Sequence, residues 1–292
     1  MKNNNISQNL GYIVYFLIYF FITFIVLAMI FYSELIGILI TTGIYTVSLI
    51  LSFSNLGESI IRRMVYARRL TTGREITYLV PLFHAVYKQA IKRNPNIGKK
   101  IKLYIIEDNE INAFAIGKNT ICITTKSIIA LSQEEIKGLL AHEFGHIAHG
   151  HTKALLLDNI GNGIFSVFIA ILNFFIRILY MATHVEEENE LGDVFKFFYY
   201  SIFYLLKATI FIIEMPKIII TRLNSRKNEY NADYFAYEIG FGSQLAEVLY
   251  ILLDLYGDNL GKISDTIKSS HPYTSVRIKR LEQLISGRYL AE

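Results

Sequence analysis

Residues 141–147 read AHEFGHI, and this stretch sets two histidines, His142 and His146, four positions apart with Glu143 directly after the first. In a helix such residues stand one turn apart on one face, so both imidazoles can reach a single tetrahedral zinc ion at about 2.0–2.1 Å. Glu143 points about 100° to the side, where it can take a proton from a water activated by the metal. The stretch therefore predicts a zinc site if it is helical.

The residues around the motif indicate a helix with a defined beginning and end. Ser132 followed by Glu135 is a capping box, apolar residues then recur at helical spacing, and Gly150 marks the end. The apolar residues on both sides bury the helix, where an unpaired imidazole or carboxylate would be costly. This favours a metal site over a polar surface helix. We expect His149 and His151, which follow at the helix end, to face solvent.

A third protein ligand has to come from a distant segment. A catalytic zinc ion has three protein ligands and one open position, and no His-x-x-Gly-x-x-His arrangement follows His146. The run RKNEYNADYFAYEIG at 226–240 supplies Glu229 and Asp233, four residues apart and hence on one helical face. We predict that Glu229 coordinates the metal. Asp233 can accept the free N–H of a ligand histidine and hold its tautomer.

A region with strand character precedes the motif. Residues 75–93 have helical apolar spacing, and they are followed by the Ile- and Thr-rich runs 100–108, 112–117 and 119–128. The sequence GKN at 117–119 marks a turn between the last two runs. We therefore expect a small, partly antiparallel sheet before the zinc-binding helix.

The first part of the chain is strongly apolar. The chain is 52% hydrophobic, and residues 12–32 and 35–53 carry no charge. Each run is long enough to cross a hydrocarbon core of about 30 Å, which takes about 20 residues. Only Ser33 and Glu34 separate the runs, so they predict a helical hairpin. The first run lacks an A-x-A-like exit, which favours a retained membrane anchor over a cleaved signal peptide.

Two further apolar stretches, 164–181 and 197–221, flank the acidic loop HVEEENELGD. Arg177 and Lys207 interrupt them, and a charge at mid-bilayer costs a few kcal/mol, so we expect both to face the bundle interior or an interface. Two more membrane crossings are predicted, giving about four. The alternative is a pair of long helices packed on the soluble domain or lying in the interface.

The placement of basic residues predicts the orientation. Arginines cluster at 62–74, after the second apolar run, and further basic residues follow the fourth run at 222–227. The positive-inside rule puts both regions, and both termini, in the cytoplasm. A cluster beside a membrane exit is expected to contact anionic lipid heads, not nucleic acid. The one cysteine, Cys122, lies in a strand-like run and is interpreted as a buried thiol, consistent with a reducing cytoplasm.

Five features, in order, make the chain resemble HtpX-type membrane zinc metalloproteases, bacterial relatives of the CAAX prenyl proteases. These are the N-terminal hydrophobic hairpin, NAFA at 112–115, LAHEFGH at 140–146, NEYNADYFA at 228–236 and HPYTSVRIKRL at 271–281. The resemblance implies an α+β membrane protein, with a zincin-like, mainly helical catalytic domain, a small antiparallel sheet and about four transmembrane helices. The corresponding division is a transmembrane hairpin at 1–54, a cytoplasmic catalytic domain in two parts at 55–160 and 222–292, and a second hydrophobic pair at 161–221.

The resemblance also implies a role for each candidate residue. It implies one Zn²⁺ per chain with three protein ligands, His142, His146 and Glu229. Glu143 is then the general base and acid, and Asp233 supports a ligand histidine. Substrate contacts come from another set: Asn112, Ala113, Phe114, His271 and Arg277. The first three resemble an edge strand that receives an extended substrate backbone, and the last two resemble a pair that steadies the substrate carbonyl or the oxyanion.

The predicted function is that of a membrane-bound zinc endopeptidase in the bacterial inner membrane. It would cut protein or peptide substrates on the cytoplasmic side, in stress response and in quality control of misfolded or damaged membrane proteins, as the resemblance implies. Two alternatives stay open. One is a signal-transducing metalloprotease, although such a protein normally carries an extracytoplasmic sensor domain and the predicted outer loops are short. The other is a catalytically inactive metal-binding membrane scaffold.

Overall fold

The structure is a computed structural model of the whole chain. The residues it describes are 4–156, 226–258 and 273–287, with short pieces at 170, 173–174, 177–178, 197–198, 200–205, 207–208 and 211. The chain divides into two compact units, which are taken in turn. One unit comprises Leu10–Leu49 with Asp158–Thr221, and the other Met1–Asn9, Ile50–Leu157 and Arg222–Glu292. The predicted domain boundaries stay a prediction.

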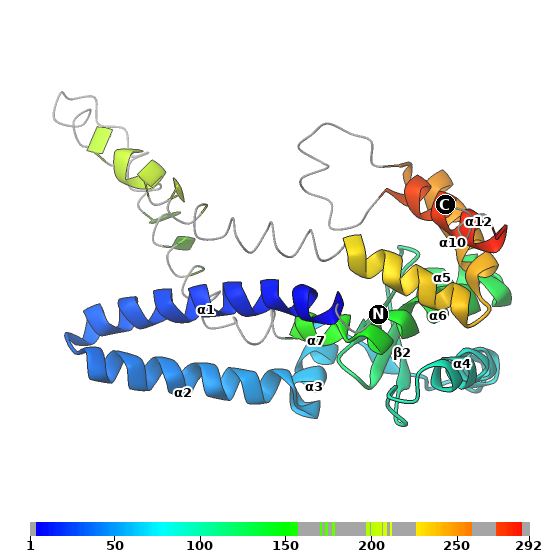
Figure 1. Cartoon of the computed structure of the whole chain (residues 1–292), viewed down its shortest axis with the longest axis horizontal. Helices are drawn as coiled ribbons and strands as arrows, with labels where there is room; N and C mark the ends of the chain where they lie inside the picture. Colours follow the sequence, from blue (N-terminus) through cyan, green and yellow to red (C-terminus); the bar gives the residue numbers. More distant parts are fainter. Residues whose placement is uncertain are drawn as a thin grey trace. The chain divides into compact units, whose positions relative to one another are not determined.

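The predicted N-terminal hairpin is confirmed. Helix α1 spans Asn4–Phe31 and α2 spans Glu34–Ser52, and they lie side by side with a tight turn between them (Figure 1). The hydroxyl of Tyr45 lies 3.1 Å from Thr23 Oγ1, so its polar tip is satisfied inside the hairpin. The rings of Phe16 and Phe20 meet the Tyr45 ring edge-on, at centroid distances of 5.1 and 5.3 Å. Aromatic packing around one polar contact thus joins the two helices.

Among the described side chains, α2 is the one helix long and apolar enough to cross a membrane by length and composition, and Phe16–Met29 of α1 is a shorter apolar helix. The predicted spans 164–181 and 197–221 lie largely outside the described residues. One described contact joins them, since Lys207 Nζ donates to Asn173 Oδ1 at 2.9 Å. Four crossings stay a prediction.

The sheet of the other unit has the strand order β1-β2-β4-β3. Its strands are β1 (Arg68–Arg69), β2 (Lys102–Ile106), β3 (Ala113–Ile116) and β4 (Thr120–Thr124). The prediction of an antiparallel sheet is confirmed for β3–β4, but it is wrong for β2–β4, which pair in parallel. Strand β1 was not predicted, and it pairs antiparallel with β2. The reason for the parallel pairing is that the chain changes direction twice, between β2 and β3 and again at the turn 117–119. Strand β4 therefore runs in the same direction as β2 and pairs with it on the side that β3 leaves free. Strand β3 therefore lies at the edge of the sheet.

Helices surround this sheet, and their bounds follow from local signals. They are α3 (Asn55–Met64), α4 (Gly73–Arg93), α5 (Thr125–Ala130), α6 (Gln133–His149), α7 (His151–Leu156), α10 (Gly242–Tyr256), α12 (Thr274–Ile285) and a further helical segment at 226–238. The predicted capping box of Ser132 and Glu135 is confirmed, as is the end of α6 at Gly150. The predicted buried thiol is confirmed too, because Cys122 in β4 is fully buried and its burial raises the thiol pKa to about 12.

Helix α6 is the centre of the hydrophobic core, between α4, α10 and β3. Two glycines on one face let other helices approach its backbone closely. A Cβ on Gly138 would lie 2.5 Å from the backbone nitrogen of Leu245, and a Cβ on Gly145 would lie 2.7 Å from Ala232 Cα. The second contact brings the helix of residues 226–238 against the motif.

Hydrogen bonds with side chains of α3 and α7 hold the turn between β3 and β4. The backbone N–H of Lys118 donates to Glu58 Oε1 at 2.6 Å, and the Thr120 hydroxyl donates to Glu58 Oε2 at 3.3 Å. From α7, the Thr152 hydroxyl donates to the carbonyl oxygen of Gly117. Both Glu58 and Thr152 are buried. The edge strand is thus held by side chains of α3 and α7.

Candidate metal centre

The structure brings together the three predicted metal ligands. His142 and His146 lie on α6, and Glu229 on the helix of residues 226–238. The Nε2 atoms of the two histidines are 3.1 Å apart. Glu229 Oε2 lies 3.4 Å from His142 Nε2, and Glu229 Oε1 lies 3.5 Å from His146 Nε2. Among the described residues, this is the one group of at least three His, Cys, Asp or Glu side chains close enough to share an ion.

These separations fit a tetrahedral zinc ion. Donor atoms at 2.0–2.1 Å from such an ion stand about 3.3 Å from one another. The distance of 3.1 Å between the two nitrogens is close to this value, and so are those of 3.4 and 3.5 Å, each of which joins one imidazole to a different oxygen of Glu229. Two imidazoles and one carboxylate also form a donor set that zinc accepts in catalytic sites, where the fourth position stays open. The residues present therefore fit the metal that the sequence predicted.

Asp233 lies where its predicted role requires. Its Oδ1 is 2.9 Å from His142 Nδ1, which keeps a hydrogen on Nδ1, so that Nε2 is the ring nitrogen that faces the ligand group. The guanidinium of Arg277 in α12 donates two hydrogen bonds to the Asp233 carboxylate, from Nη2 at 2.7 Å and from Nε at 2.9 Å. Its third nitrogen, Nη1, lies 3.1 Å from Glu229 Oε2. Arg277 is itself buried, and its positive charge compensates the charges of these two buried carboxylates.

The environment sets the protonation of the ligands. Burial, and then the neighbouring His142, lowers the pKa of His146 to about 3, so this imidazole is neutral with a free lone pair. Burial also acts to lower the pKa of His142, but hydrogen bonds with Asp233 and Glu229 outweigh it and raise the pKa to about 10. A proton thus occupies the ligand group near neutral pH. Binding of a metal ion displaces that proton.

Glu143 is buried next to the edge strand. Burial raises the pKa of its carboxyl group to about 7, and the backbone N–H of Ala115 donates a hydrogen bond to it. A carboxyl group that titrates near neutrality can both accept and return a proton at neutral pH. The raised pKa of Glu143 could not be inferred from the sequence motif, because it depends on the burial of this side chain in the folded site.

The free edge of β3 lies beside Glu143. The backbone N–H of Thr124 donates to the carbonyl of Asn112, so hydrogen-bonded pairs alternate from there along β3 and β4. By this alternation the backbone groups of Ala113 and Ala115 point away from β4, toward the free edge. Asn112 is exposed and immediately precedes the strand, and Phe114 is half-buried within it.

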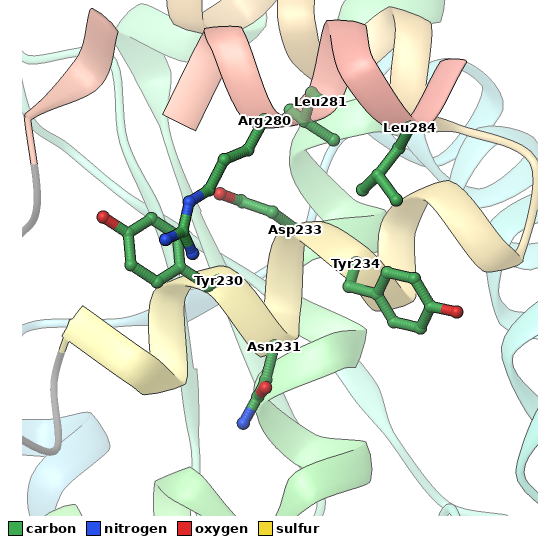
Figure 2. A pocket seen from close by; sticks show the side chains of 7 residues that line it. All are labelled: Tyr230, Asn231, Asp233, Tyr234, Arg280, Leu281 and Leu284. Atoms are coloured by element: carbon green, nitrogen blue, oxygen red, sulfur yellow. The ribbon is translucent and has the colours of Figure 1, made fainter. Parts of the chain in front are cut away.

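A cavity of about 250 Å³ lies between the helix of residues 226–238 and α12 (Figure 2). Its lining residues are Tyr230, Asn231, Asp233, Tyr234, Arg280, Leu281 and Leu284. The Arg280 guanidinium lies over the Tyr230 ring at 3.7 Å from the centroid. Asp233 thus connects the metal centre on one side with this cavity on the other.

Two predictions on histidines have different outcomes. His271, the predicted partner of Arg277, lies outside the described residues. The expectation that His149 and His151 face solvent is wrong, since both are half-buried against the end of α6. His149 Nδ1 lies 2.9 Å from the Gly145 carbonyl oxygen, and His151 Nδ1 lies 3.0 Å from His146 Nδ1. His149 bends back to a carbonyl of its own helix, one turn earlier, whereas the left-handed conformation of Gly150 places His151 against His146.

The fold and the site together define a metallopeptidase, with a His-Glu-x-x-His helix completed by a carboxylate from a later helix. The model of "Peptidase family M48" matches residues 82–285, and the chain belongs to this family. Membership makes it a metalloprotease, a hydrolase, and implies protein or peptide substrates. The resemblance seen in the sequence is thereby confirmed.

Curated relatives agree with this assignment. Protease HtpX of Wigglesworthia glossinidia brevipalpis is 30% identical over 226 residues, which cover 72% of this chain and 73% of the relative. A Protease HtpX homolog of Thermoanaerobacter pseudethanolicus is 27% identical over 206 residues, which cover 63% of this chain and 66% of the relative. The chain thus spans about two thirds of the length of these relatives.

A solved structure shares the fold. The crystal structure of S. mikatae Ste24p is similar with a TM-score of 0.52 at 19% sequence identity, covering 90% of this chain and 61% of that chain. At this identity the likeness concerns the arrangement of the backbone.

Proposed function

We propose that the chain is a membrane-bound, zinc-dependent endopeptidase in which His142, His146 and Glu229 hold the metal. The observation that carries the proposal is the convergence of these three side chains. Their ring nitrogens lie 3.1 Å apart, and each lies 3.4 to 3.5 Å from a different oxygen of Glu229, beside the buried carboxyl group of Glu143. When bound, the zinc ion supplies Lewis acidity to a peptide carbonyl and to the attacking water. Asp233 and Arg277 keep the ligand side chains in place.

Glu143 moves the proton in this proposal. Its carboxylate accepts a proton from the water that attacks the peptide carbonyl and then passes it to the leaving amine. Burial raises the pKa of this carboxyl group in the metal-free chain, and such a group is a stronger base than an exposed carboxylate. His271 is proposed to steady the oxyanion together with Arg277, whose described contacts include Glu229, Asp233 and His142 Nδ1.

The edge strand is proposed to position the substrate. An extended peptide can add to β3 as a further strand, using the outward N–H and carbonyl groups of Ala113 and the outward carbonyl group of Ala115, whose N–H donates to Glu143. Asn112 and Phe114 flank these groups and would contact substrate side chains. Such binding reads the main chain, which suits a protease that acts on many sequences.

The cellular setting follows from the apolar and basic segments. The α1–α2 hairpin and the apolar stretches 164–181 and 197–221 would form a multi-pass anchor in the inner membrane, with the catalytic unit and both termini in the cytoplasm. Damaged or misfolded membrane proteins are then the proposed substrates. Labelling of single cysteines introduced at 184–193 from the outer face tests this topology.

The Glu143→Gln variant tests the activity. The full chain in detergent should bind one zinc ion per chain, and Glu143→Gln should keep the metal but cleave casein about 10²–10⁴-fold more slowly, because the amide cannot accept the proton. Glu134→Gln is the matched control, since Glu134 is an exposed carboxylate on the same helix. Equal cleavage by wild type and Glu143→Gln would refute the mechanism. A wild type that binds zinc without cleaving casein would favour the inactive scaffold.

A further inference from the structure

The two histidines of the motif differ in the group that forms a hydrogen bond with their Nδ1 atom, the ring nitrogen that faces away from the proposed metal position. His142 has a carboxylate at its Nδ1, that of Asp233 at 2.9 Å. His146 has no carboxylate there among the described residues. Its Nδ1 faces another imidazole, with His151 Nδ1 at 3.0 Å. This distance is that of a hydrogen bond between ring nitrogens, and the two rings meet at 68° with centroids 5.3 Å apart.

The position of His151 is fixed by the chain on both sides. Gly150 adopts the left-handed conformation, with φ of 74°, and ends α6, and α7 starts at the next residue. The next residue, Thr152, is buried and its hydroxyl donates to the Gly117 carbonyl oxygen. The His149 ring stacks on the His151 ring, with centroids 5.4 Å apart and planes 15° apart. The imidazole of His151 is therefore held against the last turn of α6.

The direction of the hydrogen bond follows from the ligand role of His146. If Nε2 of His146 binds a metal ion, its hydrogen has to be on Nδ1, which then donates. His151 Nδ1 is the acceptor, and the His151 hydrogen lies on its Nε2. That Nε2 atom is buried and has no hydrogen-bond partner in the described part of the chain. The opposite direction would put a hydrogen on His146 Nε2, within the ligand group.

We propose that His151 is a positioning residue of the metal centre, which accepts a hydrogen bond from His146 Nδ1 and thereby fixes the ring orientation and tautomer of that ligand. The inference rests on the proposed zinc site and deepens it. The site is then asymmetric: an ionised carboxylate supports one ligand histidine, and a neutral imidazole supports the other. His151 is not among the side chains that converge on the metal position, so it acts through its hydrogen bond with His146.

An isosteric pair of variants tests the hydrogen bond. Asparagine places an acceptor oxygen near the position of the His151 Nδ1 atom, whereas leucine has the same shape without an acceptor. Zinc affinity of the full-length protein in detergent is measured by competition with a chromogenic chelator. His151→Leu should bind zinc about 10- to 100-fold more weakly than wild type, the usual effect of losing such a partner. His151→Asn should recover to within about tenfold of wild type.

A second readout reports on the ligand geometry. With Co²⁺ in place of zinc, His151→Leu should shift the visible absorption bands of the bound ion, and His151→Asn should restore them. His84→Leu is the control for loss of one histidine, since His84 is exposed on α4. Circular dichroism of the metal-free proteins shows whether each variant is folded. If His151→Leu does not fold, His151→Ala replaces it, because alanine adds no apolar bulk.

The outcomes separate this inference from the proposed zinc site. If wild type binds no zinc, the zinc site itself fails. If wild type binds zinc and His151→Leu binds it equally well with unchanged Co²⁺ bands, only the positioning role of His151 fails. A loss as complete as that in His146→Ala would make His151 a ligand and would also overturn the inference.

Discussion

A methyl group added at Gly145 should disrupt the metal centre from outside it. Gly145 lies between the two ligand histidines on α6, and its ideal Cβ position is 2.7 Å from Ala232 Cα and 2.9 Å from Ala232 O. These are backbone atoms, which cannot rotate away. Ordinary contact needs at least 3.4 Å, so in Gly145→Ala the helix of residues 226–238 has to retreat by about 0.7 Å. Glu229 lies on that helix and would retreat with it.

The magnitude follows from the tolerance of metal sites. Metal–ligand distances hold to about ±0.2 Å, so a retreat of about 0.7 Å takes the Glu229 carboxylate out of range unless its side chain reorients. We expect zinc affinity to fall at least about tenfold, the lower end of the effect of losing an outer partner. The higher helix propensity of alanine favours the variant by about 1 kcal/mol, whereas overpacking costs about 1–3 kcal/mol, so the metal-free protein should also lose stability.

Zinc affinity by chelator competition and thermal unfolding of the metal-free protein check this prediction. Gly73→Ala serves as the matched control, because a Cβ at Gly73, the first residue of α4, meets nothing within 4 Å. It should leave zinc affinity unchanged. If Gly145→Ala matches Gly73→Ala in both measurements, close packing of the two helices does not position Glu229, and the reasoning is wrong.

Two further predictions concern helix starts. A hydrogen bond from Arg68, and then one from the Thr71 backbone, lowers the pKa of Glu75 to about 2, so its contribution to stability is present above pH 4.5 and is lost as the pH falls through 2. Glu75→Gln should therefore be less stable than wild type above pH 5, and the difference in unfolding temperature should vanish near pH 2. Ser132→Ala removes the cap of α6, which should cost about 1 kcal/mol and lower the unfolding temperature by about 2–4 °C. An unchanged unfolding temperature in this variant would show that the cap does not limit stability.

The local features of the fold were predictable because they depend on short-range rules. The capping box at Ser132, the helix end at Gly150 and the hairpin turn at 117–119 all follow from residue chemistry within a few positions. Spacing alone placed the motif histidines on one face. The pairing of Glu229 with them was a reasoned choice of a third ligand, and the geometry brings the three together.

Other features depend on tertiary packing and were out of reach. Strands β2 and β4 pair in parallel although β3 lies between them in the sequence. The alternation of apolar residues does not show whether two strands pair in parallel or antiparallel. His151 was expected to face solvent, because the sequence does not show that the chain after α6 places this side chain against His146. The importance of Gly145 was missed too, although a glycine facing Ala232 on a later helix is the signal that close packing leaves in a sequence.

The length of β3 sets how much extended main chain a substrate has to offer in order to pair with it. Four residues span only about 14 Å, so a peptide that pairs with this edge has to offer at least that length of main chain free from its own helix or sheet. A natively folded domain with short, constrained loops cannot supply it, whereas a frayed or unravelled chain can. Discrimination between intact and damaged proteins would then arise from the local unfolding free energy of the target, with no need for a preferred sequence.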